Sequence, residues 1–224
     1  KYLTHKSKLD TKLLDQQSQH WEKNFSNKPE MFGLDASEPA KKSLKIFQEN
    51  NINTVVELGA GLGRDSIFFS LNNLSVTSLD YSRSGINIIN KKIKDNKLKN
   101  INSKLFDIRQ KLPFEDNSID GCFSHMLYCM ALSNQDLLNL NREIYRILKP
   151  KGLNIYTARN EHDGDYKNGI HRGEDMYENE GFIVHFFNKT KIKYLSDGFK
   201  NIKLENFEEG KFPRKLYFVV NKKI

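Results

Sequence analysis

The chain has 224 residues, which is enough for one well-packed domain. A hydrophobic fraction of 38%, with 15 Phe and 9 Tyr, excludes an intrinsically disordered polypeptide, because disordered chains lack such core material. No run of 18 apolar residues occurs, the first residues lack a signal-peptide core, and Cys122 and Cys129 are too few for a disulfide scaffold. We therefore expect a cytoplasmic protein with two reduced thiols.

The net charge of +8 is compatible with a nucleic-acid partner, but the basic residues are scattered. Many lie along one predicted helix and its exit, from Lys91 to Lys99, and most others lie near the two termini. A solvated helix face explains this distribution better than a phosphate-binding stripe. Charge alone decides nothing about the partner.

Residues 1–36 are polar and irregular, with Trp21, Phe25, Met31 and Phe32 interspersed. This pattern predicts an N-terminal arm or lid whose aromatic side chains pack onto a larger body. Residues 37–224 are predicted to form one domain, and Ser37 is the expected N-cap of its first helix, over residues 38–50.

From residue 54 onward, short apolar runs alternate with segments of helical periodicity. Strands are predicted over residues 54–58, 75–80, 101–106, 119–124 and 153–158. Helices are predicted between them over residues 64–72, 82–96 and 135–148. The alternation indicates a Rossmann-like, doubly wound α/β fold in which helices cover both faces of a mostly parallel sheet.

The end of the chain departs from this alternation. Residues 159–188 form a long polar stretch with few periodic signals, which we interpret as a solvated acidic loop on the substrate side that acts as a lid with residues 1–36. No metal site is expected there, because its His, Asp and Glu residues match no ligand spacing. After a short helix at 190–196, strands 201–207 and 216–221 are joined by too few residues for a parallel crossover, so they must pair antiparallel.

Three glycines follow the first strand of the α/β region. Gly59, Gly61 and Gly63 leave the backbone bare for a ligand, and the helix behind them points free N–H groups at the same space. Asp80 ends the next strand, where a carboxylate can accept both hydroxyls of a ribose, and Asp107 follows the third strand. The ordered set predicts a pocket for an adenine nucleoside at the carboxyl ends of the strands.

The glycine spacing also separates possible adenine cofactors. The spacing is G-x-G-x-G, and Arg64 stands where a dinucleotide-binding turn has its third glycine. That glycine lets helix and strand pack closely over a pyrophosphate. Its absence, together with Glu57 two residues before the first glycine, counts against NAD.

The segment from Val55 to Asp65 resembles the first motif of class I S-adenosylmethionine-dependent methyltransferases. The segments 79–82, 107–108, 112–120 and 148–152 are similar to the later motifs of that family, so the resemblance covers about residues 40–158. It implies a seven-stranded sheet with one antiparallel strand near the C-terminus, which agrees with the predicted closing strands. It also implies that the chain is an enzyme with S-adenosylmethionine as cofactor and S-adenosylhomocysteine as product.

The resemblance implies a role for each residue that matches a motif. The cofactor would be bound by residues of the first motif, the second motif, the third motif and the tip of the fourth strand: Glu57, Gly59, Ala60, Gly61, Gly63, Arg64, Asp65, Asp80, Tyr81, Ser82, Asp107, Ile108 and Ser124. The glycines would cradle the methionyl part, Asp80 the ribose, and Asp107 with Ile108 the base.

Catalytic residues are harder to identify, because methyl transfer depends mainly on alignment and desolvation. His125 is the leading candidate for a base or for positioning the acceptor, and a pocket-lining histidine without a catalytic role is an equal alternative. His185 and Tyr128 are further candidates, for which simple burial is the alternative.

Within the superfamily, Gly63-Arg64-Asp65 and the segments around Phe186 and Tyr217 are similar to tellurite-resistance and thiopurine-type small-molecule methyltransferases. We therefore expect a small-molecule methyl acceptor. A nucleic-acid (RNA) methyltransferase or an RNA-binding protein is the alternative, although Ser124-His125-Met126-Leu127 stands where amino-methylating nucleic-acid enzymes carry an Asn/Asp-Pro-Pro-aromatic stretch. The sequence does not indicate the acceptor atom or the oligomeric state.

Overall fold

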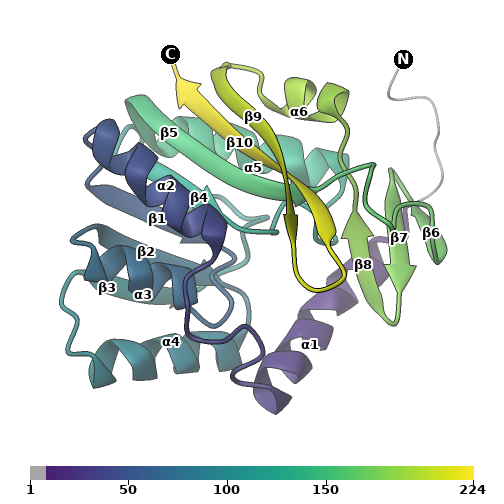
Figure 1. Cartoon of the computed structure of the whole chain (residues 1–224), viewed down its shortest axis with the longest axis horizontal. Helices are drawn as coiled ribbons and strands as arrows, with labels where there is room; N and C mark the ends of the chain where they lie inside the picture. Colours follow the sequence, from purple (N-terminus) through teal and green to yellow (C-terminus); the bar gives the residue numbers. More distant parts are fainter. Residues whose placement is uncertain (1–8) are drawn as a thin grey trace.

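The computed structural model describes residues 9–224. The helices are α1 (Thr11–Asn27), α2 (Glu38–Glu49), α3 (Arg64–Leu71), α4 (Arg83–Asp95), α5 (Asn134–Ile147) and α6 (Lys189–Leu195). The strands are β1 (Thr54–Leu58), β2 (Ser75–Asp80), β3 (Ile101–Leu105), β4 (Ile119–Ser124), β5 (Leu148–Arg159), β6 (Ile170–Gly173), β7 (Met176–Asn179), β8 (Phe182–His185), β9 (Phe199–Glu209) and β10 (Arg214–Lys223). Figure 1 shows their arrangement.

The main sheet has seven strands in the order β3-β2-β1-β4-β5-β10-β9. Strands β1 to β5 are parallel to their neighbours, and β10 is antiparallel to both β5 and β9. The strand order reverses between β1 and β4, which is where ligands bind in open α/β sheets. The predicted Rossmann-like sheet with one antiparallel strand near its end is confirmed.

Helices cover both faces of the sheet because successive strand residues alternate between two cores. Val55 belongs to the core beneath α2 and α3, and the next residue, Val56, belongs to the core beneath α5 and α6. Helix α4 lies beside β2 and β3 at the end of the sheet (Figure 1). This layering brings the turns after β1, β2 and β4 to one edge.

The expectation that residues 1–36 are irregular is wrong for residues 11–27, which form α1, while residues 1–8 lie outside the described part of the chain. Helix α1 begins after Asp10, whose side chain accepts a hydrogen bond from the Leu13 amide, as an N-cap does. It buries Leu14 and Phe25 against the rest of the molecule. Most of its other side chains are polar, so the helix depends on this tertiary packing rather than on its own composition.

The expectation of a solvated loop over residues 159–188 is also wrong. This stretch contains a three-stranded antiparallel sheet, β6-β7-β8. Its strands are four residues long and are joined by the two-residue turns Glu174-Asp175 and Glu180-Gly181, in which all four residues have positive φ. Mirror-image turns of this kind suit hairpins but favour Asn-Gly or Asp-Gly pairs, so Glu174-Asp175 gave no recognisable turn signal.

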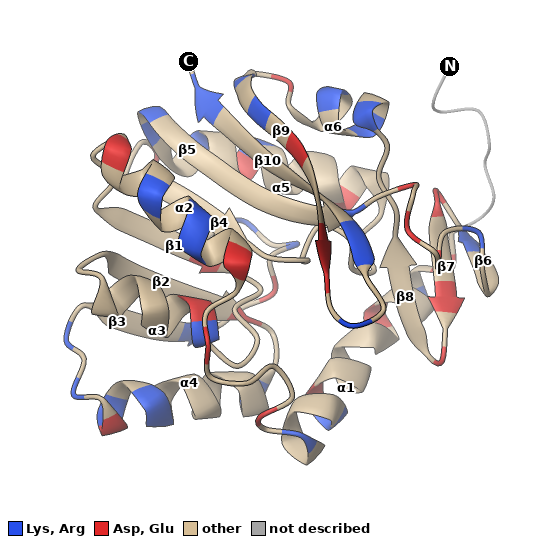
Figure 2. Cartoon of the chain, viewed as in Figure 1, with Lys and Arg blue, Asp and Glu red and all other residues tan. Residues whose placement is uncertain are grey.

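Charged residues are spread over the molecule rather than gathered on one element. Figure 2 shows Lys and Arg on α2, α4, α6 and the end of β10, with Asp and Glu interspersed. Among residues 9–224, no helix is both long and apolar enough to cross a membrane. In the same part of the chain, no group of three His, Cys, Asp or Glu side chains is placed to hold a metal ion.

Candidate functional site

The turn between β1 and α3 contains the three predicted glycines in left-handed conformations, with φ values of 68° at Gly59, 56° at Gly61 and 80° at Gly63. A Cβ at Gly59 would lie 2.8 Å from Leu127 Cδ1, and one at Gly63 would lie 2.6 Å from Ile89 Cγ1. Both the backbone conformation and the packing therefore require glycine here. The turn presents bare backbone to the edge of the sheet.

Asp80, at the end of β2, holds this turn in place. Its Oδ2 accepts a hydrogen bond of 2.8 Å from the Gly61 amide, and its Oδ1 accepts one of 2.8 Å from the Ser82 amide. Burial raises the pKa of the Asp80 carboxyl to about 6, although these hydrogen bonds favour the charged form. The carboxylate also borders the cavity described below, so it retains lone pairs for a ligand.

Glu57 lies at the base of the same turn. Its carboxylate accepts a hydrogen bond from the hydroxyl of Ser66, and the Ser78 hydroxyl donates to Ser66 Oγ at 2.6 Å. Burial, followed by the nearby charge of Asp65, raises the pKa of Glu57 well above its usual range. The side chain therefore combines a supporting role in the turn with a place on the cavity wall.

A cavity of about 780 Å³ opens along the carboxyl ends of β1, β2 and β4. Ligand sites commonly have volumes of about 300–1,000 Å³, so this one can hold a nucleoside cofactor and a small second molecule. Of the proposed cofactor residues, the cavity wall includes Glu57, Gly59, Ala60, Gly61, Arg64, Asp65, Asp80, Tyr81, Asp107 and Ile108. The other three, Gly63, Ser82 and Ser124, are not part of the cavity wall.

Asp107 forms an ion pair with Arg109, which the sequence did not predict. Arg109 donates to both of its carboxylate oxygens, at 3.1 Å from Nε to Oδ1 and 2.7 Å from Nη2 to Oδ2, and its Nη1 also donates to Asp15 of α1 at 2.5 Å. Burial opposes ionisation of Asp107, but the bonds from Arg109 outweigh it and lower the pKa. Arg109 thus links the adenine side of the cavity to α1.

The two residues after the glycine turn have different surroundings. Asp65 accepts hydrogen bonds from the amide and hydroxyl of Ser37, at 2.7 and 2.8 Å, and so fixes the start of α2. Arg64 donates to the carbonyl of Phe32 at 2.9 Å and lies over its ring. Of the two, Arg64 has the more exposed side chain, at 23% against 4%.

His125, just after β4, lies on the cavity wall next to two residues from distant strands. Its Nδ1 is 2.7 Å from the hydroxyl of Thr157 in β5, and its Nε2 is 3.1 Å from a carboxylate oxygen of Glu209 in β9. The Thr157 oxygen also accepts a 2.8 Å hydrogen bond from the Met126 amide. Arg159 and Arg214 complete this end of the cavity.

Tyr128 and His185 do not border the cavity, and both side chains are completely buried. Tyr128 stacks on Tyr156 with ring centroids 3.9 Å apart and shares hydrogen bonds with Asn141 and Asn154. These contacts place it in the core, away from any substrate.

His185 is held between a carbonyl and an ammonium group. Its Nδ1 lies 2.7 Å from the carbonyl of Leu132, and Lys191 Nζ lies 2.6 Å from its Nε2. Burial and the Lys191 charge lower the pKa of His185 to about 3, so the ring is neutral at physiological pH. Both sequence candidates thus have structural partners in place of access to the cavity.

Sequence reasoning missed several residues that the fold brings to the site, including Glu22, Arg109, Thr157 and Glu209. Glu209 lies 84 positions beyond His125, in a hairpin that has no motif. No local signal marks such a residue, because its importance comes only from the pairing of β10 with β5 and β9.

Three solved structures illustrate the fold similarity. A SAM-dependent methyltransferase from Methanosarcina mazei aligns with a TM-score of 0.70 at 16% identity, covering 85% of this chain and 99% of its own. TehB from Haemophilus influenzae aligns with a TM-score of 0.68 at 19% identity, covering 91% and 67%. The 1,6-didemethyltoxoflavin-N1-methyltransferase of Burkholderia thailandensis, with bound substrate and S-adenosylhomocysteine, aligns with a TM-score of 0.71 at 12% identity, covering 95% and 89%.

At these identities the structural matches show the fold alone, and a comparison with curated proteins found no match. The family assignment comes from the sequence: residues 55–152 match the family described as methyltransferase domain. That stretch runs from β1 to the start of β5 and contains the glycine turn, Asp80 and Asp107. The chain therefore carries a class I S-adenosylmethionine-dependent methyltransferase domain.

Proposed function

We propose that this enzyme transfers a methyl group from S-adenosylmethionine to a small molecule held beneath α1. The observation that carries the proposal is the continuous cavity of about 780 Å³, which joins the glycine turn and Asp80 to His125 and to aromatic side chains of α1. A cofactor at the turn and an acceptor at the other end would meet inside one cavity.

The chain's own residues fit this cofactor. The backbone of Gly59 and Gly61 borders the cavity, where it can contact the methionyl part, and Arg64 can face its carboxylate. The remaining lone pairs of Asp80 can accept ribose hydroxyls, while Tyr81 and Ile108 can flank the base. Bound S-adenosylmethionine would supply an electrophilic methyl group, whose bond to sulfur breaks with its electrons staying on sulfur.

The protein would contribute alignment and exclusion of water. Helix α1 covers the cavity with Trp21 and Phe25, and β8 adds Phe182, whose ring lies 5.2 Å from that of Trp21. Correct placement of two reactants can lower a barrier by roughly 7–11 kcal/mol in favourable cases. We interpret α1 and the β6-β7-β8 sheet as the lid that provides this enclosure.

A small-molecule acceptor is supported by the form and the charge of the site. The acceptor end of the cavity combines apolar side chains of α1 and β8 with a few polar groups, a surface suited to a compact organic molecule. In the part of the chain that Figure 2 colours, Lys and Arg lie on several separate elements with Asp and Glu between them, whereas a phosphate backbone favours a basic stripe. The 1,6-didemethyltoxoflavin-N1-methyltransferase named above acts on a small molecule, which supports the same acceptor class, and the two free, buried cysteines support a cytoplasmic location.

Titration calorimetry with S-adenosylhomocysteine and with NAD tests the cofactor. We expect saturable binding of S-adenosylhomocysteine, and binding of NAD alone would refute the proposal. A panel of small thiols, amines, phenols and metalloid oxyanions, scored by formation of S-adenosylhomocysteine, then identifies the acceptor class. Methylation of RNA in preference to every panel member would overturn the small-molecule proposal.

A further inference from the structure

Both ring nitrogens of His125 are engaged within the protein. Its Nε2 lies 3.1 and 3.2 Å from the two carboxylate oxygens of Glu209, so this nitrogen must carry a proton. Its Nδ1 lies 2.7 Å from the Thr157 hydroxyl, whose oxygen already accepts the Met126 amide. In the neutral imidazole the Thr157 O–H therefore donates to Nδ1. Neither nitrogen is left to receive a proton from a bound molecule.

Glu209 is the group of this cluster that can still accept a hydrogen bond. Both carboxylate oxygens share one N–H of His125, whereas an ionised carboxylate has about four acceptor positions. Within residues 9–224, no other hydrogen bond to this carboxylate is found. Its side chain is 27% exposed, and it borders the cavity.

The surroundings of Glu209 keep it ionised. Burial disfavours its charged form, but the hydrogen bond from His125, with the nearby guanidinium groups of Arg64 and Arg214, outweighs burial and lowers the pKa of the carboxyl. Thr157 orients the His125 ring through Nδ1, and the ring in turn orients the Glu209 carboxylate through Nε2. The cavity thus contains a fixed anionic acceptor of hydrogen bonds.

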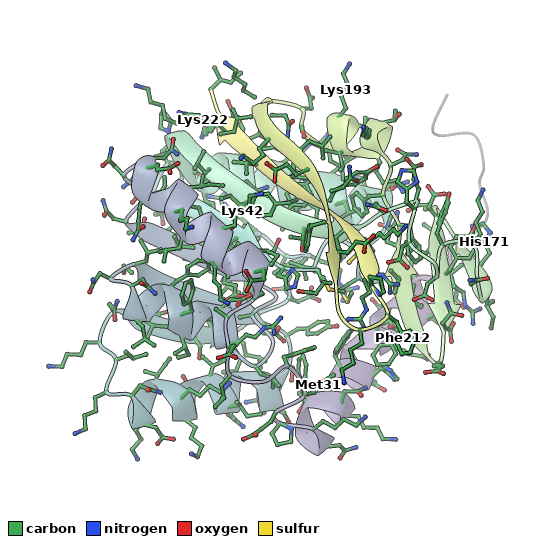
Figure 3. The ribbon with its side chains drawn as sticks, in the orientation of Figure 1. Met31, Lys42, His171, Lys193, Phe212 and Lys222 are labelled. Atoms are coloured by element: carbon green, nitrogen blue, oxygen red, sulfur yellow. The ribbon has the colours of Figure 1, made fainter. Side chains whose placement is uncertain are left out.

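Aromatic side chains form another part of the acceptor end, which Arg159 and Arg214 also border, with Arg159 held in ion pairs with Asp163 and Asp165. Trp21 and Phe25 of α1 lie 5.4 Å apart between ring centroids, and Phe182 of β8 lies 5.2 Å from Trp21. Leu127, next to the glycine turn, and Met31, labelled in Figure 3, also border the cavity. These aromatic and aliphatic side chains suit a flat, uncharged ring system, whose single hydrogen-bond donor would then donate to Glu209.

We propose that Glu209 accepts a hydrogen bond, and then the proton, from the nucleophilic N–H of a compact, weakly basic aromatic amine or nitrogen heterocycle. His125 is then a positioning residue that acts through Glu209. This inference rests on the proposed function and assigns the acceptor class for the same site. It disfavours thiolates, which have no proton to donate to the Glu209 carboxylate.

The proton balance follows from the chemistry of nitrogen. When the nitrogen lone pair forms the bond to the methyl carbon, the nitrogen becomes cationic and its N–H becomes strongly acidic. That proton passes to a Glu209 oxygen, which leaves a neutral methylated amine beside a neutral carboxyl group. Release of the proton to water then restores the carboxylate. A carboxylate with a low pKa is basic enough for this step, because the donor is a cation.

The first test measures binding and does not need turnover. Trp21 is the only tryptophan and borders the cavity, so its fluorescence reports on the acceptor end. The full chain, saturated with S-adenosylhomocysteine, is titrated with indoline, N-methylindoline and 2,3-dihydrobenzofuran, which share a skeleton but only the first of which has an N–H. We expect indoline to bind about tenfold or more tightly than the other two, as for a lost hydrogen bond to a charged group.

Glu209→Gln keeps the shape and the bond to His125 but removes the charge. The variant should lose the preference for indoline while its affinity for S-adenosylhomocysteine stays the same. Glu208→Gln is the matched control, because Glu208 is the preceding, exposed residue of the same strand and its side chain points to the other face. An unchanged preference in Glu209→Gln, or none in the native chain, would overturn the assignment.

The second test compares nucleophiles in turnover. Glu209→Gln should lower kcat/KM for indoline by roughly 10²-fold and for benzenethiol by less than threefold, because only the amine must lose a proton. An equal loss for both acceptors overturns the role of Glu209 but leaves the methyltransferase proposal intact. Failure of the native chain to bind S-adenosylhomocysteine would instead refute the proposed function, so the two failures are distinguishable.

Discussion

Glu22 of α1 and Ser82, the N-cap of α4, are 60 residues apart in sequence, and their side chains form a hydrogen bond of 2.6 Å. The Glu22 carboxylate also accepts from the Ser84 amide at 3.2 Å, while the Ser82 hydroxyl accepts from the Gly85 amide at 3.0 Å. A carboxylate at the N-terminus of α4 accepts hydrogen bonds from backbone N–H groups that have no partner within the helix. The positive end of the helix dipole also stabilises its negative charge. Glu22 therefore fastens the lid helix to the cofactor side of the cavity.

Glu22→Gln should loosen α1, because it removes the charge at the start of α4. We expect a loss of about 0.5–2 kcal/mol in unfolding free energy, as for other caps. Hydrogen exchange over residues 11–27 should also become faster. Lys23→Gln is the control, because Lys23 follows Glu22 in α1 and its own side chain is exposed. Equal exchange rates in the two variants would show that the contact does not hold α1.

Gly63→Ala should destabilise the whole domain, because the new Cβ would lie 2.6 Å from Ile89 Cγ1 at a residue with φ of 80°. Overpacking of this kind costs typically about 1–3 kcal/mol, to which the strained backbone adds. Gly164→Ala provides the comparison, since no atom lies within 4 Å of a Cβ there. Urea denaturation measures both, and equal midpoints would contradict the packing argument.

Affinity for S-adenosylhomocysteine should fall in acid because of Asp80. Burial raises the pKa of its carboxyl to about 6, and only the ionised form can accept two ribose hydroxyls. The dissociation constant should rise about tenfold per pH unit below pH 6 and stay level above it. Asp80→Asn should bind more weakly by over about 1 kcal/mol at pH 8 and lose this slope. Titration calorimetry at several pH values measures these dissociation constants. If Asp80→Asn kept the same dependence on pH as the native chain, Asp80 would not be the ribose-binding group.

His185 should make the fold sensitive to acid. Burial and Lys191 lower its pKa in the folded chain from 6.5 to about 3, so between these values the unfolded chain binds the extra proton. The contribution of neutral His185 to the unfolding free energy is fully present above pH 6.5. It is lost as the pH falls towards 3, by up to about 1.4 kcal/mol per pH unit. His185→Asn should flatten the decline in unfolding free energy between pH 6.5 and 4. A decline as steep as in the native chain would assign the sensitivity to other groups.

Segments with strong local signals could be predicted from the sequence. The glycine turn was visible because left-handed backbone beside a strand end requires glycine at Gly59, Gly61 and Gly63. Asp80 and Asp107 could be predicted because Asp80 ends one predicted strand and Asp107 closely follows the next. The antiparallel ending followed from the short link between the last two strands, which excludes a crossover.

Helix α1 and the β6-β7-β8 sheet were not predictable in the same way. The helix has few apolar side chains and is held by contacts such as Glu22 with Ser82, and the small sheet begins with a turn that lacks glycine. In both, tertiary contacts stabilise a backbone that local propensity leaves undecided.

The sequence by itself determined the sheet and the cofactor turn, because periodicity, glycine conformation and strand-end acids act within a few residues of one another. Only the tertiary structure decided which side chains face the acceptor. Glu209 meets His125 because β10 inserts between β5 and β9, and Trp21 reaches the cavity because α1 packs beside α4 and β8. Such contacts join residues far apart in the chain, and their energy depends on burial and orientation, which a linear pattern does not contain.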